Sequence, residues 1–255
     1  MSERKPAAED AARLMAALWR VAPAKKARGP RPSSSVDEVV DAAIAIADAD
    51  GFEALTIRGV ADRLGVSPMS VYTYVSTKAG LFALMVDAVN LRMDRSRPKA
   101  RTWRARVTAV ADDNRRLYER HPWLVTLPPN RPPLGPGTLA KYEYELGALE
   151  DVGLDDVSID AALGFVLGFV ESCAHASARA RAAEQESSQS DADWWDAYGP
   201  ELARAYDPSK YPLATRIGSA SGEHHQGPHS STFAYTFGLA RVLDGLEALV
   251  RGAKR

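Results

Sequence analysis

Hydrogen-bonding and aromatic side chains are concentrated on one short predicted helix, Pro68–Tyr74, with the sequence PMSVYTY. Val71, together with Val75 one turn later, can face a protein core. The other positions carry hydroxyls, aromatic rings and a thioether, where a helix selected only for stability would favour Ala, Glu or Lys. Such groups can reach base edges, thymine methyls and phosphate oxygens. The residue types therefore predict recognition of DNA.

Two helices joined by a tight turn would position these side chains. Apolar residues at i, i+3, i+4 and i+7 predict a helix over residues 56–64, and Gly65 can adopt the left-handed conformation that ends it. Ser67 is a favoured N-cap, and Pro68 suits the first position of the next helix. This spacing is typical of a helix-turn-helix, although the turn alone is equally compatible with an ordinary corner between two helices.

A further helix precedes this pair. Apolar residues recur at helical spacing from Val36 to Ala47, and Asp50-Gly51 ends the pattern. Helices at 36–49, 56–64 and 68–74 are together the minimum that could close a small core around a recognition helix.

The N-terminal segment combines a candidate helix with a basic linker. The helix, around Ala11–Trp19, could either pack on the body of the protein or extend from it. Residues 22–35 are rich in Pro, Gly and Ser and include Lys25, Lys26 and Arg28. This composition suits a solvated tether, and equally a flexible arm that lies along phosphates or in the minor groove.

The rest of the chain predicts a helical body without strands. Helical periodicity recurs over 81–89, 103–120, 138–151, 158–183 and 231–252. Between 183 and 230 the composition is acidic and then rich in Ser, Gly and His, which predicts solvated loops. We therefore expect an all-α fold.

Overall composition gives little direct information about partners. The 255 residues carry a formal net charge of −1, so DNA binding must depend on local charge placement. The single Cys173 excludes an intrachain disulfide and suits a reducing compartment. The N-terminus does not have the pattern of a signal peptide, and the longest apolar run, residues 161–170, is too short to span a bilayer. We expect a cytoplasmic protein that does not bind a membrane.

An enzyme is the alternative class. His224, His225 and His229 could gather a metal ion, with His175 or Glu223 completing the set. The three histidines stand in a Gly/Ser/Pro-rich segment that offers no rigid scaffold. The chain has no P-loop, dinucleotide fingerprint or Gly-x-Ser-x-Gly elbow. We therefore predict no catalytic residue, no metal site and no cofactor.

Residues 36–89 resemble the TetR-type transcriptional repressors. The features that carry the resemblance are Asp50-Gly51-Phe52, Leu55-Thr56-Ile57-Arg58, Leu64-Gly65-Val66, and Val71-Tyr72 before Tyr74-Val75 and Lys78. The resemblance implies a three-helix DNA-binding domain at 36–82, after the extension and linker at 1–35. It also implies a helical regulatory and dimerisation domain at 83–255.

The resemblance assigns roles to individual DNA-binding residues. Thr56 and Arg58 would contact the backbone or a base, while Tyr72 and Lys78 would hold phosphates. The residues that would face the major groove are Pro68, Met69, Ser70, Thr73 and Tyr74. We add Lys25, Lys26 and Arg28 as candidate phosphate contacts from the linker.

The body would supply the dimer interface and a small-molecule site. Phe233–Val250 is similar to the closing helix of the tetracycline-repressor-like subgroup, which implies a homodimer through helices near 158–183 and 231–252. Glycine pairs Gly164/Gly168 and Gly238/Gly245 predict close approach of another helix. Candidate effector-binding residues, which could equally be plain core, are Trp103, Tyr118, Trp123, Tyr142, Phe165, Phe169 and Cys173.

Together these features predict a repressor that binds a palindromic operator as a homodimer and is released by a small apolar or aromatic effector. Recognition of a tetracycline–magnesium complex is not expected, because Arg92-Met93-Asp94 stands where those relatives carry a histidine, and His121 lies in a different local pattern. The alternatives are an effector-independent or activating regulator and, with less support, a metal-dependent helical enzyme.

Overall fold

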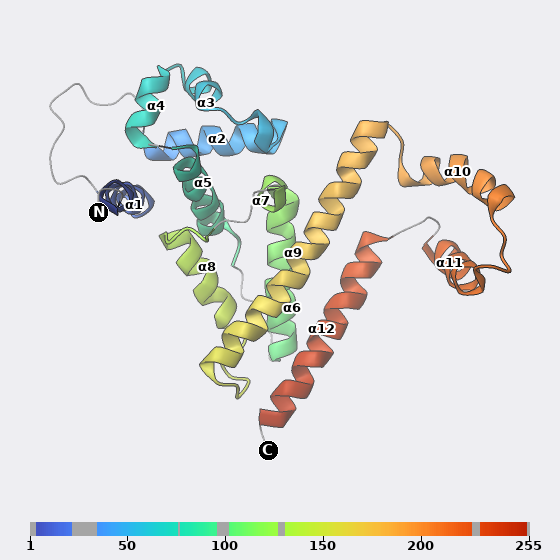
Figure 1. Cartoon of the computed structure of the whole chain (residues 1–255). Coiled ribbons are helices and arrows are strands. Elements are labelled where there is room, and N and C mark those ends of the chain that lie inside the picture. Colours follow the sequence, from blue (N-terminus) through green and yellow to red (C-terminus); the bar gives the residue numbers. More distant parts are fainter. Residues whose placement is uncertain are drawn as a thin grey trace, which may run out of the picture.

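The computed structural model describes residues 4–21, 35–75, 77–95, 102–126, 131–225 and 230–253. Within these ranges every regular element is a helix, which confirms the predicted all-α class. Figure 1 shows a DNA-binding unit joined by α5 (Lys78–Arg92) to a body in which two long helices, α9 (Asp156–Ser187) and α12 (Ser231–Ala253), run side by side.

The DNA-binding unit consists of α2 (Val36–Asp50), a short turn of 3-10 helix at Phe52–Ala54, α3 (Ile57–Leu64) and α4 (Pro68–Tyr74). Ser35 and Glu38 form a capping box at the start of α2, and Gly65 ends α3 in the left-handed conformation with φ of 66°. Val60 and Val71 are fully buried between the helices. These bounds agree with the three helices that the sequence predicts.

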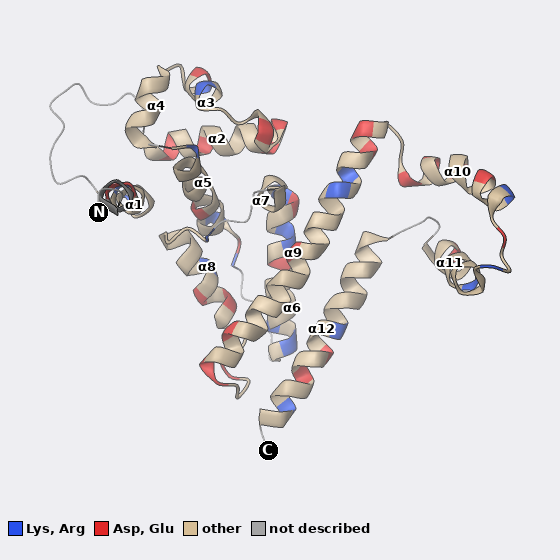
Figure 2. Cartoon of the chain, viewed as in Figure 1, with Lys and Arg blue, Asp and Glu red and all other residues tan. Residues whose placement is uncertain are grey.

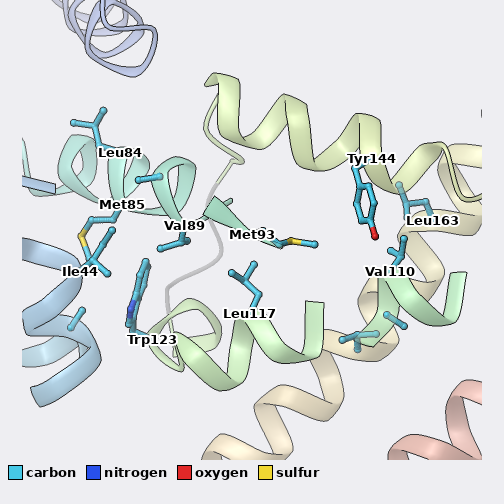
Figure 3. Close-up of a cluster of buried hydrophobic side chains, with 14 of the residues drawn as sticks. Ile44, Leu84, Met85, Val89, Met93, Val110, Leu117, Trp123, Tyr144 and Leu163 are labelled. Carbon is cyan, nitrogen blue, oxygen red and sulfur yellow. The ribbon is translucent and has the colours of Figure 1, made fainter. Parts of the chain in front are cut away.

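One core runs from this unit into the body. Trp123 of α7 (Trp123–Thr126) belongs to the same buried cluster as Ile44 of α2 and Met85 of α5, and the cluster continues to Leu117 of α6 (Trp103–Arg120) (Figure 3). Helices α2 to α4 therefore do not form a separately packed domain, because they share a hydrophobic core with the body. Helix α7 thus packs directly against α2 of that unit and against α5.

The contact of α5 with α8 (Pro136–Leu146) is unusually close. A Cβ at Gly137 would overlap the backbone carbonyl oxygen of Asp87. The Asp87 carboxylate in turn accepts a hydrogen bond of 2.8 Å from the backbone N–H of Thr138. Gly137, in the first turn of α8, thus stands where the two backbones meet.

The N-terminal helix α1 (Arg4–Leu18) packs on α5, which decides between the two sequence interpretations. Leu18 is buried, and the Trp19 indole donates a 2.9 Å hydrogen bond to the carbonyl oxygen of Leu134. Arg20 pairs with Asp37 at 2.6 Å. The extension is therefore attached to both the body and the DNA-binding unit.

The prediction of loops between 183 and 230 is wrong. Helix α9 continues to Ser187, and α10 (Asp191–Ala205) and α11 (Pro212–His225) follow, extending away from the body in Figure 1. Local interactions explain the helices despite their exposure. Ser190 and Asp193 form a capping box, and Trp194 stacks on Tyr198 one turn later at 5.1 Å between ring centroids.

Candidate DNA-reading face and effector cavity

The outer side of α4 presents the side chains that the sequence singles out. Met69 is 74% exposed and Tyr72 is 46% exposed, and Pro68 and Thr73 are exposed beside them. The buried side chain of Val71 packs the helix on the core, and the Ser67 side chain caps its N-terminus by accepting a hydrogen bond from Ser70 N–H. The α4 sequence has no charged residue, and the helix is therefore tan throughout in Figure 2.

Three of the predicted contacts are partly engaged within the protein. The Ser70 hydroxyl lies 3.0 Å from that of Ser67, and Tyr74 is half-buried against the core. Thr73 donates a 3.2 Å hydrogen bond to the carbonyl oxygen of Met69. Met69 and Tyr72 are therefore the α4 side chains most available to DNA.

Residues flanking α4 complete the face. Thr56 caps α3 by accepting a 3.0 Å hydrogen bond from Gly59 N–H, while the Arg58 side chain next to it is exposed. The Lys78 ammonium lies 5.3 Å and 5.5 Å from the ring centroids of Phe52 and Phe82. These two rings restrict the cation at the start of α5, and sequence reasoning missed this role for them. Lys25, Lys26 and Arg28 lie outside the described residues.

A cavity of about 350 Å³ opens between α6, α9 and the beginning of α12. Its walls include Tyr118 of α6, Cys173 of α9 and Tyr235 of α12. The predicted effector residue Phe169 does not line the cavity, but its ring stacks on Tyr235 with 6.0 Å between ring centroids. The size falls in the range of small-molecule sites.

The other predicted effector residues do not line this cavity. Trp123 is buried in the core below the DNA-binding unit, and Trp103 is half-buried at the start of α6. Tyr142 is exposed and donates to Asp160 at 2.6 Å, and Phe165 is 57% exposed. Sequence reasoning instead missed Arg115 and Tyr235. Arg115 stands one turn before Tyr118 on α6, and this spacing was the available signal.

Burial controls the protonation of the cavity groups. Desolvation, with the nearby carboxylates of Glu171 and Glu145, raises the pKa of Tyr118 well above its usual value. Burial likewise raises the pKa of the Cys173 thiol. Both groups are therefore protonated at neutral pH, and Tyr118 can serve as a hydrogen-bond donor.

The turn after α6 joins this cavity to the DNA-binding unit. Pro122 and Val125 line the cavity. Trp123 lies between these two residues in the chain, and its Nε1 donates a hydrogen bond of 2.7 Å to Asp48 Oδ1. His121, which precedes Pro122, has its Nδ1 2.8 Å from the same oxygen. Asp48 belongs to α2. This carboxylate therefore joins the turn that lines the cavity to the DNA-binding unit, beside the apolar contacts of Trp123.

Helices α9 and α12 leave one apolar side uncovered. Phe165 of α9 and Phe237 of α12 are each more than half exposed. A Cβ at Gly164, Gly168 or Gly245 would meet nothing within 4 Å, whereas one at Gly238 would overlap the Phe169 ring. Close approach within the chain thus accounts for Gly238 alone among the four glycines.

Among the described residues no group of three or more His, Cys, Asp and Glu side chains could hold a metal ion. His224 and His225 lie on α11, where both rings contact Phe233. His229 lies outside the described residues. The metal-dependent alternative therefore gains no support from this part of the chain.

The fold and these surfaces define a helix-turn-helix regulator with a separate helical body. Comparison with known proteins places it further: the chain belongs to the tetR family of bacterial regulatory proteins, whose model matches residues 39–85. A tetracyclin repressor-like C-terminal domain matches residues 97–250. The protein is thus a transcriptional regulator and not an enzyme, and the family that the sequence predicts is confirmed.

Individual relatives agree with this assignment. The chain is similar to the HTH-type transcriptional repressor DrrR1 of Streptomyces coeruleorubidus, with 36% identity over 94% of this chain and 87% of the relative. It also resembles the TetR family protein ActR of Streptomyces coelicolor in complex with actinorhodin, with a TM-score of 0.68, 25% identity, and coverage of 85% and 96% of the two chains. The apo ActR structure gives a TM-score of 0.70 at 23% identity and covers 88% of this chain and 100% of that one.

Proposed function

We propose that this protein represses transcription as a homodimer on a palindromic operator and that a small molecule in the cavity between α6, α9 and α12 releases it. The observation that carries this proposal is the shared turn at 121–125. The turn lines the cavity through Pro122 and Val125, and it bonds to α2 through His121 and Trp123. An occupant that moves the turn would also move α2, and with it the DNA-binding unit.

The relatives support the same reading. ActR binds actinorhodin in one solved structure, and DrrR1 is described as a repressor. A typical coupling free energy between two sites is about 1–3 kcal/mol, or a loss of roughly 5- to 150-fold in operator affinity. This is enough to relieve repression without unfolding either domain.

The dimer would form through the uncovered sides of α9 and α12. Phe165, Phe237 and the exposed glycines offer apolar, small-residue surfaces of the kind that helices bury against one another. Helix α9 is long and apolar enough by composition alone to cross a membrane, with only 22% of its most apolar window buried in one chain. A partner subunit covering this side accounts for that composition in a cytoplasmic regulator.

The DNA contacts would divide by type. Met69, Ser70, Thr73, Tyr74 and Pro68 would meet base edges, and Tyr72, Lys78, Thr56 and Arg58 would hold the backbone or a neighbouring base. The linker residues Lys25, Lys26 and Arg28 would add phosphate contacts. A two-fold dimer places two such faces one or more helical turns apart, which requires matching half-sites.

A cavity-filling variant tests the proposal. Ala178 of α9 lines the cavity, and Ala178→Trp should occupy it while leaving α3 and α4 unchanged. We expect this variant to bind its upstream DNA in gel shifts but to have an altered response to added extracts of the cells that produce the protein. Leu213→Trp, at an exposed position on α11, is the control. Equal responses of both variants and the wild type would contradict an effector site here.

A further inference from the structure

Two hydrogen-bond donors on α6 converge on the effector cavity without a partner. The Nε of Arg115 is buried and makes no hydrogen bond, because its nearest carboxylate oxygen, on Glu119, is 3.7 Å away. The Tyr118 hydroxyl takes part in no hydrogen bond among the described residues. The two residues are three positions apart and therefore share one face of the helix. Leaving the buried Arg115 Nε unpaired is costly, and the Tyr118 hydroxyl offers a second donor in the same cavity, so the pair favours an occupant that carries an acceptor.

The charges around the cavity argue against an anionic occupant. Arg115 and Arg181 line it, but so do Glu119, Glu184 and Asp191. Outside the lining, Asp112 accepts a 2.9 Å hydrogen bond from Tyr235, and Glu171 and Glu145 act on Tyr118. Carboxylates therefore outnumber guanidinium groups. A carboxylate or phosphate on the ligand would gain from Arg115 and lose to these neighbours, whereas a neutral oxygen keeps both hydrogen bonds without that repulsion.

The walls favour a flat aromatic frame. The Arg115 guanidinium carbon lies 4.7 Å from the Tyr235 ring centroid, and Phe169, which does not itself line the cavity, stacks on the same ring. On α9 the facing positions include the small residues Ala174 and Ala178. A cavity lined by the rings of Tyr118 and Tyr235 and by small alanine side chains accepts a planar molecule with little strain.

We propose that the effector is a neutral aromatic ketone, or an aromatic molecule with an equivalent carbonyl oxygen, whose oxygen accepts hydrogen bonds from Arg115 Nε and Tyr118 Oη. This inference depends on the proposed function, since it names the ligand chemistry of that same cavity. It makes Arg115 and Tyr118 the determinants of effector specificity. The carboxylates select against acidic analogues of the same size.

Three probes of similar shape separate the possibilities: 9-fluorenone, fluorene, and fluorene-9-carboxylate. Binding to the full-length protein is measured by equilibrium dialysis, and the Ala178→Trp variant defines binding outside the cavity. We expect 9-fluorenone to bind tightest. Each hydrogen bond contributes a factor of about 2 to 10 in Kd. Arg115→Met and Tyr118→Phe should each weaken the binding of 9-fluorenone by such a factor and leave the binding of fluorene unchanged. Arg120→Met, at an exposed position on the same helix, should change neither.

The outcomes distinguish this inference from the proposed function. Equal binding of 9-fluorenone and fluorene, or tightest binding of the carboxylate, would overturn the neutral-carbonyl assignment while leaving an effector cavity in place. Binding of none of the three, or binding unaffected by Ala178→Trp, would overturn the cavity as an effector site and the inference with it. Circular dichroism and melting temperature of each variant identify any loss that comes from misfolding.

Discussion

The indole nitrogen of Trp123 and the carboxylate of Asp48 are 2.7 Å apart, and this hydrogen bond joins the body to the DNA-binding unit. Trp123 is almost completely buried, and Asp48 supplies the hydrogen-bond acceptor for its N–H. The same Asp48 oxygen lies 2.8 Å from His121 Nδ1. One carboxylate thus holds two residues of the turn that also lines the cavity.

Removal of this carboxylate should destabilise the protein. Asp48→Ala leaves the buried Trp123 donor unpaired, which costs about 1–3 kcal/mol in the free energy of unfolding. Asp50→Ala, at an exposed position on the same helix, should change it by less than about 0.5 kcal/mol. Urea unfolding followed by circular dichroism measures both, and equal effects of the two substitutions would show that the hydrogen bond contributes little.

Phosphate contacts and base contacts should separate by their dependence on salt. Arg58→Ala and Lys78→Ala should each weaken operator binding and reduce the slope of log K against log salt by about 0.9 for each phosphate that is no longer neutralised. Met69→Ala should instead change the relative affinities for operator variants at nearly constant slope. Arg120→Ala, in the body, is the control. A Met69→Ala slope change as large as that of Lys78→Ala would reverse the assigned roles.

A charge on the uncovered side of α9 should break the dimer. Phe165→Glu places a carboxylate where a partner helix would pack, so we expect monomers in sedimentation velocity and loss of binding to paired half-sites. Leu213→Glu alters another apolar residue that is more than half exposed, on α11, and should leave the dimer intact. Dimers that persist with Phe165→Glu would move the interface elsewhere.

A methyl group at the α5–α8 contact should be strongly unfavourable. Gly137→Ala must push apart the backbones at Asp87, which we expect to cost about 1–3 kcal/mol of stability. Gly218→Ala adds the same methyl where nothing lies within 4 Å, and it should stabilise α11 by up to about 1 kcal/mol. Thermal unfolding of the pair measures the difference, and a neutral Gly137→Ala would mean that α8 can shift without loss.

Alkylation of the single cysteine should report on the cavity. Burial raises the pKa of Cys173, so the reactive thiolate is scarce at neutral pH and increases as pH rises through the raised pKa. Iodoacetamide should therefore react more slowly with the folded protein than with the urea-unfolded chain at the same pH. Saturating 9-fluorenone should slow it further. Mass spectrometry follows the reaction, and equal folded and unfolded rates would show that the thiol is not shielded.

Local sequence patterns were sufficient to predict the helix-turn-helix and the helix before it. Caps at Ser35 and Ser67, the left-handed Gly65 and apolar spacing around Val60 and Val71 all involve interactions within a few residues, so the sequence alone determined helices α2, α3 and α4 and their exposed face. The same locality misled the prediction over 183–230. Polar composition indicated loops there, but a short-range cap and stacked aromatic rings support the exposed helix α10.

The cavity and its link to DNA depended on contacts between residues far apart in the chain. Tyr118 and Cys173 were recognisable as candidates, but Trp123 and Phe165 had the same composition signal and lie in the core and on the surface instead. The sequence pattern of an amphipathic helix does not distinguish aromatic residues that line a cavity from those in the core or on the surface. The sequence by itself determined a family and a DNA-reading face, because periodicity and capping are local. Only the tertiary structure decided which aromatic residues surround a cavity and that Asp48 bonds to Trp123, because those depend on how helices pack.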